Sequence, residues 1–463
     1  MKLAESPATP IALAVLGVAL RLPWAILRPW PWDWDAAYYR LTARSVTEGR
    51  GGSLDVLWTL AAPEAGLGGP PDLYWLPLPS RILVPEIALG GNGLVTVILL
   101  AALVGPLTWQ LAKSLGLRSE TALVAGILAA TGGAWIRQLG STDVYALTAV
   151  LGAMALLGVS RKRWELAALA VAAVALVRND GFLMGMALAT GFRGWRALAV
   201  AAIGPLVTAL WWARGALVGG DTFWTLRQSS AQAMTYDAIF LGPDGAPTLA
   251  ERGLAAIDAM WGVAFLWGWA AMLLFAPLLA WGAWKGRDQP IVWPWLAGFV
   301  VVPIITGILA PAVTLGGTLE RTGIALLAAH AVFLAIGLGA LADRLHAWRG
   351  YHPWFTRGLL LSAWLACALW TGFTFMGLQP PLPDCAPWEQ VPAGQRAFVR
   401  EPLLHAWTCR APAALWMDQL DPVRVRALTE DHGVCWAFLE EQPEGLAEWE
   451  EVAGGVWRAE GCE

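Results

Sequence analysis

Residues 11–49 read "IALAVLGVALRLPWAILRPWPWDWDAAYYRLTARSVTEG", an apolar run followed at once by tryptophans and two acids. The hydrocarbon core of a bilayer takes about 20 apolar residues per helix, so the run 11–29 predicts a membrane span. No small-residue cleavage site follows it, and we expect the span to be retained rather than removed as a signal peptide. Asp33 and Asp35 would then lie directly beside the membrane.

The apolar character of this run extends over most of the chain. Of the 463 residues, 57% are hydrophobic and only 14% are charged, which is more apolar surface than one soluble core can bury. Inside a bilayer every backbone group must be paired, so long apolar runs must be helices. The sequence predicts an all-α polytopic membrane protein with about eleven transmembrane helices. The runs cover 11–29, 92–112, 121–139, 144–160, 165–178, 181–192, 197–218, 256–284, 290–310, 321–341 and 357–378.

Two of these runs, 165–178 and 181–192, are each too short to cross a bilayer alone. We expect them to form a broken hairpin around "RNDG" at 178–181. Each inner loop defined by these runs carries at least two Lys or Arg. The positive-inside rule therefore predicts a multi-pass protein of the inner (plasma) membrane with a cytoplasmic N-terminus and an extracytoplasmic C-terminus.

Three segments are predicted to lie on the outer side of the membrane: the first outer loop (30–91), the second outer loop (219–255) and the tail (379–463). In the first, "DAAYYRLTARSVTEG" predicts a short amphipathic helix that ends at Gly49. The tryptophans before it are typical of the membrane interface, so the loop is expected to lie flat on the membrane. The stripe on one face of this helix comprises Ala36, Tyr39, Ala43 and Val46.

The tail differs from the rest of the chain in its charge. It carries 15 acids and 6 arginines, a net charge of −9, while residues 1–378 carry +5. This shift predicts a separate soluble extracytoplasmic domain at 379–463 beside a transmembrane domain at 1–378. "RAFV", "AALWMD", "VCWAFLEE" and "GVWRAE" are typical of short strands, and "DPVRVRALTEDHG" of a helix, so a small α/β module is expected.

Four of the five cysteines lie in this tail. An even number in an outward-facing domain indicates up to two disulfides, with three possible pairings, and buried free thiols are the alternative. These residues are Cys385, Cys409, Cys435 and Cys462.

Several well-known functional motifs are missing from the sequence. It contains no P-loop, no GxGxxG after a strand, no CxxC and no histidine cluster with metal-ligand spacing. His330, within a predicted span, is better explained as a packed, hydrogen-bonded residue than as a ligand. The sequence also lacks a clear internal repeat, which disfavours a transporter.

Acids on the outer side of a membrane cannot use cytoplasmic nucleotide donors, so a substrate would arrive through the lipid. A carboxylate held there can act as general base on an acceptor hydroxyl. A lipid phosphate would require cations, and arginine has the best shape for it. Charges within a membrane are costly, which makes such arginines functional candidates. The candidates are Arg21, Arg81, Arg178 and Arg321.

The stretch from Asp35, "DAAYYRLTARSVTEGRG", resembles the opening of the first outer loop in GT-C fold glycosyltransferases. This polyprenyl-phosphate-sugar-dependent class includes protein mannosyltransferases and aminoarabinose transferases. Later stretches are also similar to segments of that family, so the resemblance covers nearly the whole chain. They are "YWLPLPSRILVPEIALGGN" (74–92), "STDVYALTAVLGAMALLG" (141–158), "LAALAVAAVALVRNDGFLMG" (166–185) and "GGTLERTGIALLAAHAVFLAIGL" (316–338).

The resemblance implies roles for individual residues. The catalytic base of the family corresponds to Asp35, three residues before Tyr38. The first acid of the family's doublet is Trp34 here, and an extra acid stands at Asp33, so the choice between Asp33 and Asp35 stays open. Asp143 matches a second acidic position that binds a metal or the acceptor in some relatives, and a divalent metal is therefore an open possibility. Lipid-phosphate or donor contacts are implied for Arg178, Arg321, Arg81 and Tyr38, and an acceptor-side role for Tyr236 in the second outer loop.

The predicted function is that of a membrane glycosyltransferase. It would move a sugar from a polyprenyl-phosphate donor to an acceptor hydroxyl on a glycan, lipid or protein at the outer face, with inversion. The alternatives are a transporter or flippase of lipid-linked glycans and a non-catalytic scaffold. Each candidate residue also has a structural alternative. The acids at 33 and 35 could solvate the loop, Asp143 could cap a helix, Arg178 could pair with Asp180, and Arg321 could snorkel from a helix end.

Overall fold

The structure, a computed structural model, describes most of the chain. The residues described are 6–27, 29–31, 34–52, 54, 56–57, 76–132, 141–178, 181–219, 248–264, 269–309, 323–376, 383–392, 395–400, 402–415, 425–426, 428–430, 433–439, 442, 446, 448–453, 455–459 and 462.

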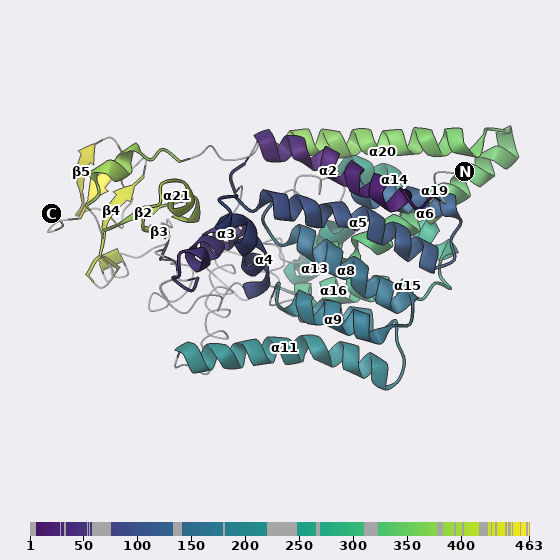
Figure 1. Cartoon of the computed structure of the whole chain (residues 1–463), viewed down its shortest axis with the longest axis horizontal. Helices are drawn as coiled ribbons and strands as arrows, with labels where there is room; N and C mark the ends of the chain where they lie inside the picture. The colour runs from purple at the N-terminus through teal and green to yellow at the C-terminus, as the bar shows by residue number, and fades with distance from the viewer. Residues whose placement is uncertain are drawn as a thin grey trace.

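Most of these residues form a helical bundle whose helices lie along the long axis of the molecule (Figure 1). A small sheet lies at one end of this axis. The helices of the bundle are α2 (Thr9–Leu27), α5 (Leu94–Ser114), α6 (Ser119–Ala130), α8 (Tyr145–Ser160), α9 (Trp164–Ala175), α10 (Gly181–Ala189), α11 (Trp195–Gly219), α13 (Leu249–Ala264), α14 (Trp269–Lys285), α15 (Val292–Leu296), α16 (Val302–Leu309), α19 (Leu327–Arg349) and α20 (Pro353–Met376).

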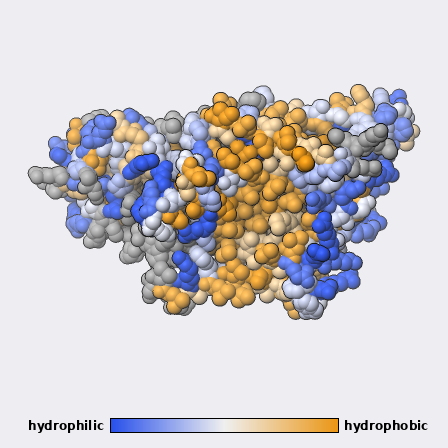
Figure 2. Space-filling model, in the orientation of Figure 1, coloured by the Kyte–Doolittle hydropathy of each residue, from blue (hydrophilic) through white to orange (hydrophobic). Residues whose placement is uncertain are grey.

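The bundle has the surface of a membrane protein. Among the described residues, four helical stretches are long and apolar enough to cross a bilayer: 9–27, 94–114, 195–217 and 324–349. On the face shown in Figure 2, an apolar band crosses the middle of the bundle, with polar surface on either side of it. The predominantly helical membrane fold is as predicted, whereas the number of about eleven spans is not confirmed.

One of the predicted runs has a more detailed structure than the sequence indicated, and the short pair of runs is as expected. The run 256–284 is described as two helices, α13 and α14, on either side of 265–268, and they pack against different neighbours, α16 and α19. The short pair is the broken hairpin that we expected. Helices α9 and α10, of 12 and 9 residues, pack against each other, and the break between them contains Arg178.

The predicted helix of the first outer loop is α3 (Trp34–Thr47), and Gly49 follows it with the positive φ of 78° that ends many helices. The helix does not bury one face alone, however. Residues 36–43 are all buried, because the bundle-side helix α4 (Pro77–Ala88) and the tail helix α21 (Pro402–Thr408) both pack against α3. The expected stripe is therefore only one of two covered faces.

The tail forms a six-stranded mixed sheet in the order β1-β3-β2-β4-β6-β5. Four strands were expected: β2 (Arg396–Val399), β3 (Ala413–Leu415), β4 (Val434–Phe438) and β6 (Val456–Arg458). Strand β5 (Glu450–Ala453) adds an edge, and the other edge is β1 (Val56–Leu57), which comes from the first outer loop and pairs in parallel with β3. The sheet thus joins the tail to that loop, and the domain boundary at 378/379 remains a prediction.

Both disulfides expected in the tail are present. Cys385 pairs with Cys409 and Cys435 with Cys462, which selects one of the three possible pairings. The first bond links the segment before β2 to the residue that follows α21. It therefore holds α21, which contacts α3, against the rest of the tail.

Two buried polar side chains in the bundle have structural partners. Arg21 donates from NH1 to the carbonyl oxygens of Gly17, at 2.8 Å, and Ala130, at 3.0 Å. Because Ala130 is the last residue of α6, Arg21 places positive charge where the helix dipole is negative. His330 is packed against Trp295 and Phe299, and its Nδ1 lies 3.0 Å from the carbonyl oxygen of Leu326, as expected for a packed histidine.

Candidate functional site

The structure brings together two of the residues that the resemblance implicates. Asp35 lies in the first turn of α3, and Arg178 lies in the break between α9 and α10. Arg178 NH1 lies 4.0 Å from Asp35 Oδ2, and the two side chains are only 15% and 14% exposed. The ion pair joins residues 143 positions apart in the sequence, and α3, which carries Asp35, lies at the end of the bundle that faces the tail (Figure 1). The alternative partner, Asp180, lies outside the described residues.

Asp143 belongs to a segment that lies against the same helix. Its neighbour Thr142 donates through Oγ1 to the carbonyl oxygen of Ala36, 3.2 Å away, and Ala36 directly follows Asp35. Asp143 itself is buried, and its Oδ1 accepts the N–H of Val144 at 2.6 Å. The N-cap residue of α8 is Val144, so Asp143 does not cap that helix.

Arg40 holds these two segments together, and the sequence analysis did not identify it as a candidate. Its guanidinium is buried. It donates one hydrogen bond from Nε to Thr142 Oγ1 and another from Nη1 to the carbonyl oxygen of Pro29, both at 2.8 Å. It thus fixes α3 to both the end of α2 and the segment before α8. The signal that could have identified Arg40 in the sequence is its position one turn after Ala36, within a run of small and aromatic residues.

The other described residues that the resemblance implicates in binding the sugar donor lie on α3 and α4. Tyr38 is one turn after Asp35, is 3% exposed and packs edge-on against Tyr39 with ring centroids 5.7 Å apart. Helix α4 begins beside Arg178, because the N–H of Leu78 donates to the carbonyl oxygen of Leu176 at 3.2 Å. Arg81 is partly buried one turn further along α4. The pair of Asp35 and Arg178 is therefore enclosed by α3, α4 and the end of α9.

Glu86, at the other end of α4, has a structural role. Its carboxylate accepts the backbone N–H groups of Gly93, Val95 and Thr96 at 2.8, 3.2 and 2.7 Å. These donors open α5, whose first N–H groups have no partner within the helix. Glu86 thus fixes α4 to α5, and α4 in turn packs against α3.

Three of the predicted site residues, Asp33, Arg321 and Tyr236, lie outside the described residues. Within the described parts of the chain, no three His, Cys, Asp or Glu side chains are grouped as they would be to hold a metal. Asp35 and Asp143 are carboxylates on adjoining segments, and carboxylate oxygens are ligands that a hard divalent cation takes.

This arrangement can support two kinds of chemistry in one place. A partly enclosed carboxylate can accept a proton from a hydroxyl within hydrogen-bond reach. The guanidinium beside it has five N–H donors, so it can bind an oxyanion while it remains near the carboxylate. Proton acceptance and stabilisation of a leaving phosphate could thus occur within a few ångströms of each other.

Replacing Arg40 by Met is expected to destabilise the protein by about 3 kcal/mol, because hydrogen bonds to charged groups contribute about 1.5–3 kcal/mol each and two are lost. The thermal midpoint of the protein in detergent, followed by tryptophan fluorescence, should fall by several degrees. The matched control is Arg118→Met, since Arg118 is 75% exposed and its ion pair with Asp343 spans 3.6 Å. Equal midpoints for the two variants would contradict a fixing role for Arg40.

Comparisons with known proteins bear on the fold. No protein-family model matches the chain, and no curated protein matches it. Among solved structures it is similar to the oligosaccharyltransferase of Archaeoglobus fulgidus in its apo form, with a TM-score of 0.55 and 11% identity over 93% of this chain and 69% of that chain. The same protein, AglB, in complex with an inhibitory peptide and a dolichol-phosphate gives a TM-score of 0.54, 12% identity, and coverage of 93% and 68%. The protein therefore has the GT-C fold that the sequence resemblance implied.

Proposed function

We propose that the protein is a membrane glycosyltransferase that moves a sugar from a polyprenyl-phosphate donor to an acceptor hydroxyl on the extracytoplasmic side. The observation that supports this proposal most strongly is the approach of Arg178 to Asp35 within 4.0 Å, at the end of an apolar bundle. A base and a phosphate-binding cation are the two groups that such a transfer requires.

The structural neighbours support the proposed class of donor. One structure of AglB holds a dolichol-phosphate and an inhibitory peptide, and another is tethered to an acceptor peptide containing the NVT sequon. A phosphorylated polyprenol has the same chemistry as the donor proposed here. The acceptor of the present protein is left as a hydroxyl-bearing molecule, because the neighbours share only the fold with it.

In the proposed reaction Asp35 accepts the proton of the acceptor hydroxyl as its oxygen attacks the anomeric carbon of the donor sugar. The bond to the phosphate oxygen breaks, the polyprenyl phosphate leaves, and Arg178 stabilises its charge. A single displacement inverts the anomeric centre. Asp33 is the alternative base. Arg321, Arg81 and Tyr38 are proposed as further donor contacts.

The acceptor side of the site is proposed to include Asp143 and Tyr236. If a divalent metal binds, Asp35 and Asp143 are the residues that would hold it, and it would supply positive charge to the phosphate or the acceptor. Asp143 already sits on a segment fixed by the contact of Thr142 with Arg40.

The proposed topology follows from the charge of the loops. The basic segments 161–163 and 193–196 would face the cytoplasm, and the candidate site, the first outer loop and the tail would lie outside. Residues 1–378 would form the transmembrane domain and 379–463 the outer domain. Strand β1 then fixes the outer domain to the loop that carries Asp35.

The test is a transfer assay in liposomes with polyprenyl-phosphate sugars labelled in the sugar, and with a membrane extract as acceptor. The proposal predicts that the label leaves the lipid and joins an acceptor only when the native protein is present. Heat-denatured protein is the control. Label that crosses the bilayer while still bonded to the lipid would overturn the proposal in favour of a flippase.

A further inference from the structure

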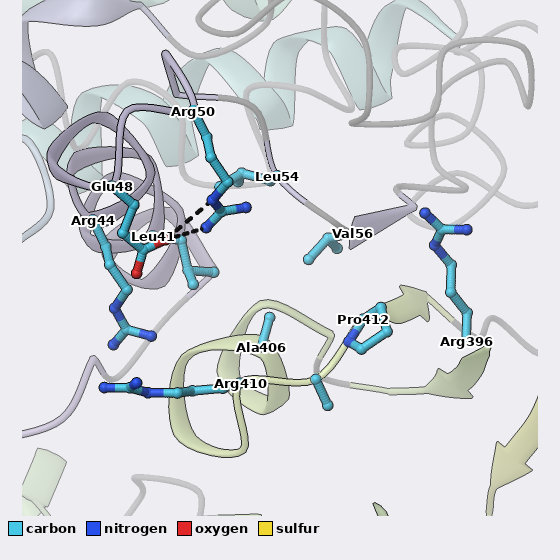
Figure 3. A pocket seen from close by; sticks show the side chains of 11 residues that line it. Leu41, Arg44, Glu48, Arg50, Leu54, Val56, Arg396, Ala406, Arg410 and Pro412 are labelled. Carbon is cyan, nitrogen blue, oxygen red and sulfur yellow. Dashed lines mark hydrogen bonds and ion pairs between the residues drawn. The ribbon is translucent and has the colours of Figure 1, made fainter. Parts of the chain in front are cut away.

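A cavity lies between α3 and the tail, on the side of α3 that faces away from the bundle. Its volume is about 520 Å³, and Figure 3 shows the side chains that line it. Both the first outer loop and the tail contribute to its wall. The residues that line it are Leu41, Arg44, Glu48, Arg50, Leu54, Val56, Arg396, Ala406, Arg410, Ala411 and Pro412.

The wall of this cavity is strongly basic. Four arginines line it, and Glu48 is the one acid among its described lining residues. That acid is already engaged, since its Oε2 lies 2.6 Å from NH2 of Arg50. The basic character stands out against the tail, which carries 15 acids and 6 arginines. Two of those six arginines, Arg396 and Arg410, are gathered at this cavity.

Arg44 is the arginine of this wall that is repelled by two of its neighbours, Arg410 and Arg50. Its guanidinium is half-buried and lies 3.9 Å from the centre of the Trp407 ring. Burial lowers its pKa, repulsion from Arg410 and Arg50 lowers it further, and attraction to Glu48 only partly offsets this. In Figure 3 the guanidinium groups of Arg44 and Arg410 extend toward the same side of the cavity. A bound anion would relieve the repulsion between them.

Arg410 is held in place by its covalent neighbour. It follows Cys409, which is bonded to Cys385, and its φ of 54° is in the left-handed region that residues with a Cβ rarely adopt. Non-glycine residues in such conformations are kept there by the surrounding structure and are common at ligand sites. Arg410 is therefore presented to the cavity by a constrained turn rather than by a free surface loop.

The cavity is distinct from the pair formed by Asp35 and Arg178. Arg44 lies nine residues after Asp35 on α3, which is about 14 Å along the helix axis and about two and a half turns around it. The two side chains therefore leave opposite sides of the helix. A phosphate bonded directly to a sugar that reacts at Asp35 cannot occupy the cavity at the same time. An anion in the cavity would therefore be a different group from that reacting phosphate.

We propose that this cavity, here called the arginine cavity, binds a phosphate-type oxyanion carried by the acceptor. Arginine is the side chain best suited to this ligand, because its planar fork matches phosphate oxygens in a bidentate manner. The wall comes half from the loop that carries Asp35 and half from the tail, so a bound acceptor would fix the tail to the loop. Only the identity of the carrier rests on the proposed function; anion binding does not.

The test is calorimetric titration of the full chain in phosphatidylcholine nanodiscs, with pyrophosphate as the probe and maltose as an uncharged comparison. Saturable binding of pyrophosphate, and none of maltose, is expected. Arg44→Gln and Arg410→Gln should each weaken binding by about tenfold, the effect of losing one charged hydrogen bond. Arg426→Gln, an exposed tail arginine outside the cavity, is the matched control and should leave the affinity unchanged.

A second set of nanodiscs distinguishes the carrier of the anion. These nanodiscs contain phosphatidylglycerol and are measured at physiological salt, which screens surface charge beyond about 8 Å. The pyrophosphate affinity should be unchanged if the ligand of the cavity comes from solution. If phosphatidylglycerol competes with pyrophosphate, and Arg410→Gln abolishes this competition, the ligand of the cavity is a lipid headgroup. That result would overturn the proposal that the acceptor carries the anion. Equal affinities in the native protein and both cavity variants would overturn the site itself. Because no transfer is measured, neither result depends on the role of Asp35.

Discussion

Asp35→Asn is expected to lower the rate of sugar transfer by about 10²–10⁴-fold, the usual contribution of a positioned general base. Asparagine keeps the size of the side chain and can still hydrogen-bond Arg178, but its amide cannot accept the hydroxyl proton. The donor should still bind, since the phosphate contact proposed for Arg178 is retained. The measurement is initial transfer rate in liposomes at saturating donor, together with donor affinity in the absence of acceptor.

Two further variants make this result specific. Glu448→Gln removes a carboxylate that is 80% exposed in the tail and should leave transfer unchanged. Asp33→Asn distinguishes the two candidate bases, since only the true base should show the large loss. Normal transfer by Asp35→Asn with a large loss in Asp33→Asn would move the base to Asp33. Normal transfer by both would refute an aspartate base in this loop.

Local sequence pattern predicted the elements whose formation depends on local signals. The apolar runs predicted α2, α5, α8 and α11 to within a few residues, because each run is long and has little polar interruption. Gly49 marked the end of α3 for a local reason, the backbone freedom of glycine. In the tail, short apolar runs bounded by polar residues predicted four of the six strands of the sheet.

The elements that were missed depend on distant parts of the chain. Strand β1 comprises two residues, and its partner β3 lies more than 350 positions later, so nothing local distinguishes it from loop. Helix α4 contains three prolines, a composition that does not by itself predict a helix. Helix α21 is seven residues long and covers the face of α3 that appeared free in the sequence. Each of these elements is stabilised by its packing more than by its own propensity.

The candidate site, too, could be predicted only in part, because residue types follow from the sequence whereas their approach depends on packing. The residue types of Asp35 and Arg178 could be read from the sequence, because charges at a membrane surface or within a span are uncommon enough to require a reason. Their approach to 4.0 Å could not, since it depends on the break between α9 and α10 and on where α3 lies. Arg40 was missed because a buried, fully packed arginine looks the same in sequence as an exposed one.

Arg178→Gln is expected to lower transfer by about 10²–10³-fold, the loss seen when one preorganised donor to a developing negative charge is removed. The effect should appear in the rate at saturating donor, because charge on the leaving phosphate grows as its bond to the sugar breaks. Arg178→Lys should recover only part of the rate, since an ammonium group cannot form two parallel hydrogen bonds with a phosphate. Single-turnover transfer of the labelled sugar measures this step directly.

The matched control is Arg163→Gln, because Arg163 flanks the opposite end of α9 and is exposed there. It removes the same charge at the far side of the bundle and should leave the transfer rate unchanged. If Arg178 serves only to hold Asp35, Arg178→Gln should add nothing to the loss caused by Asp35→Asn, because the two side chains would act through one contact. A further loss in the double variant, together with weaker donor binding, is expected if Arg178 contacts the phosphate itself.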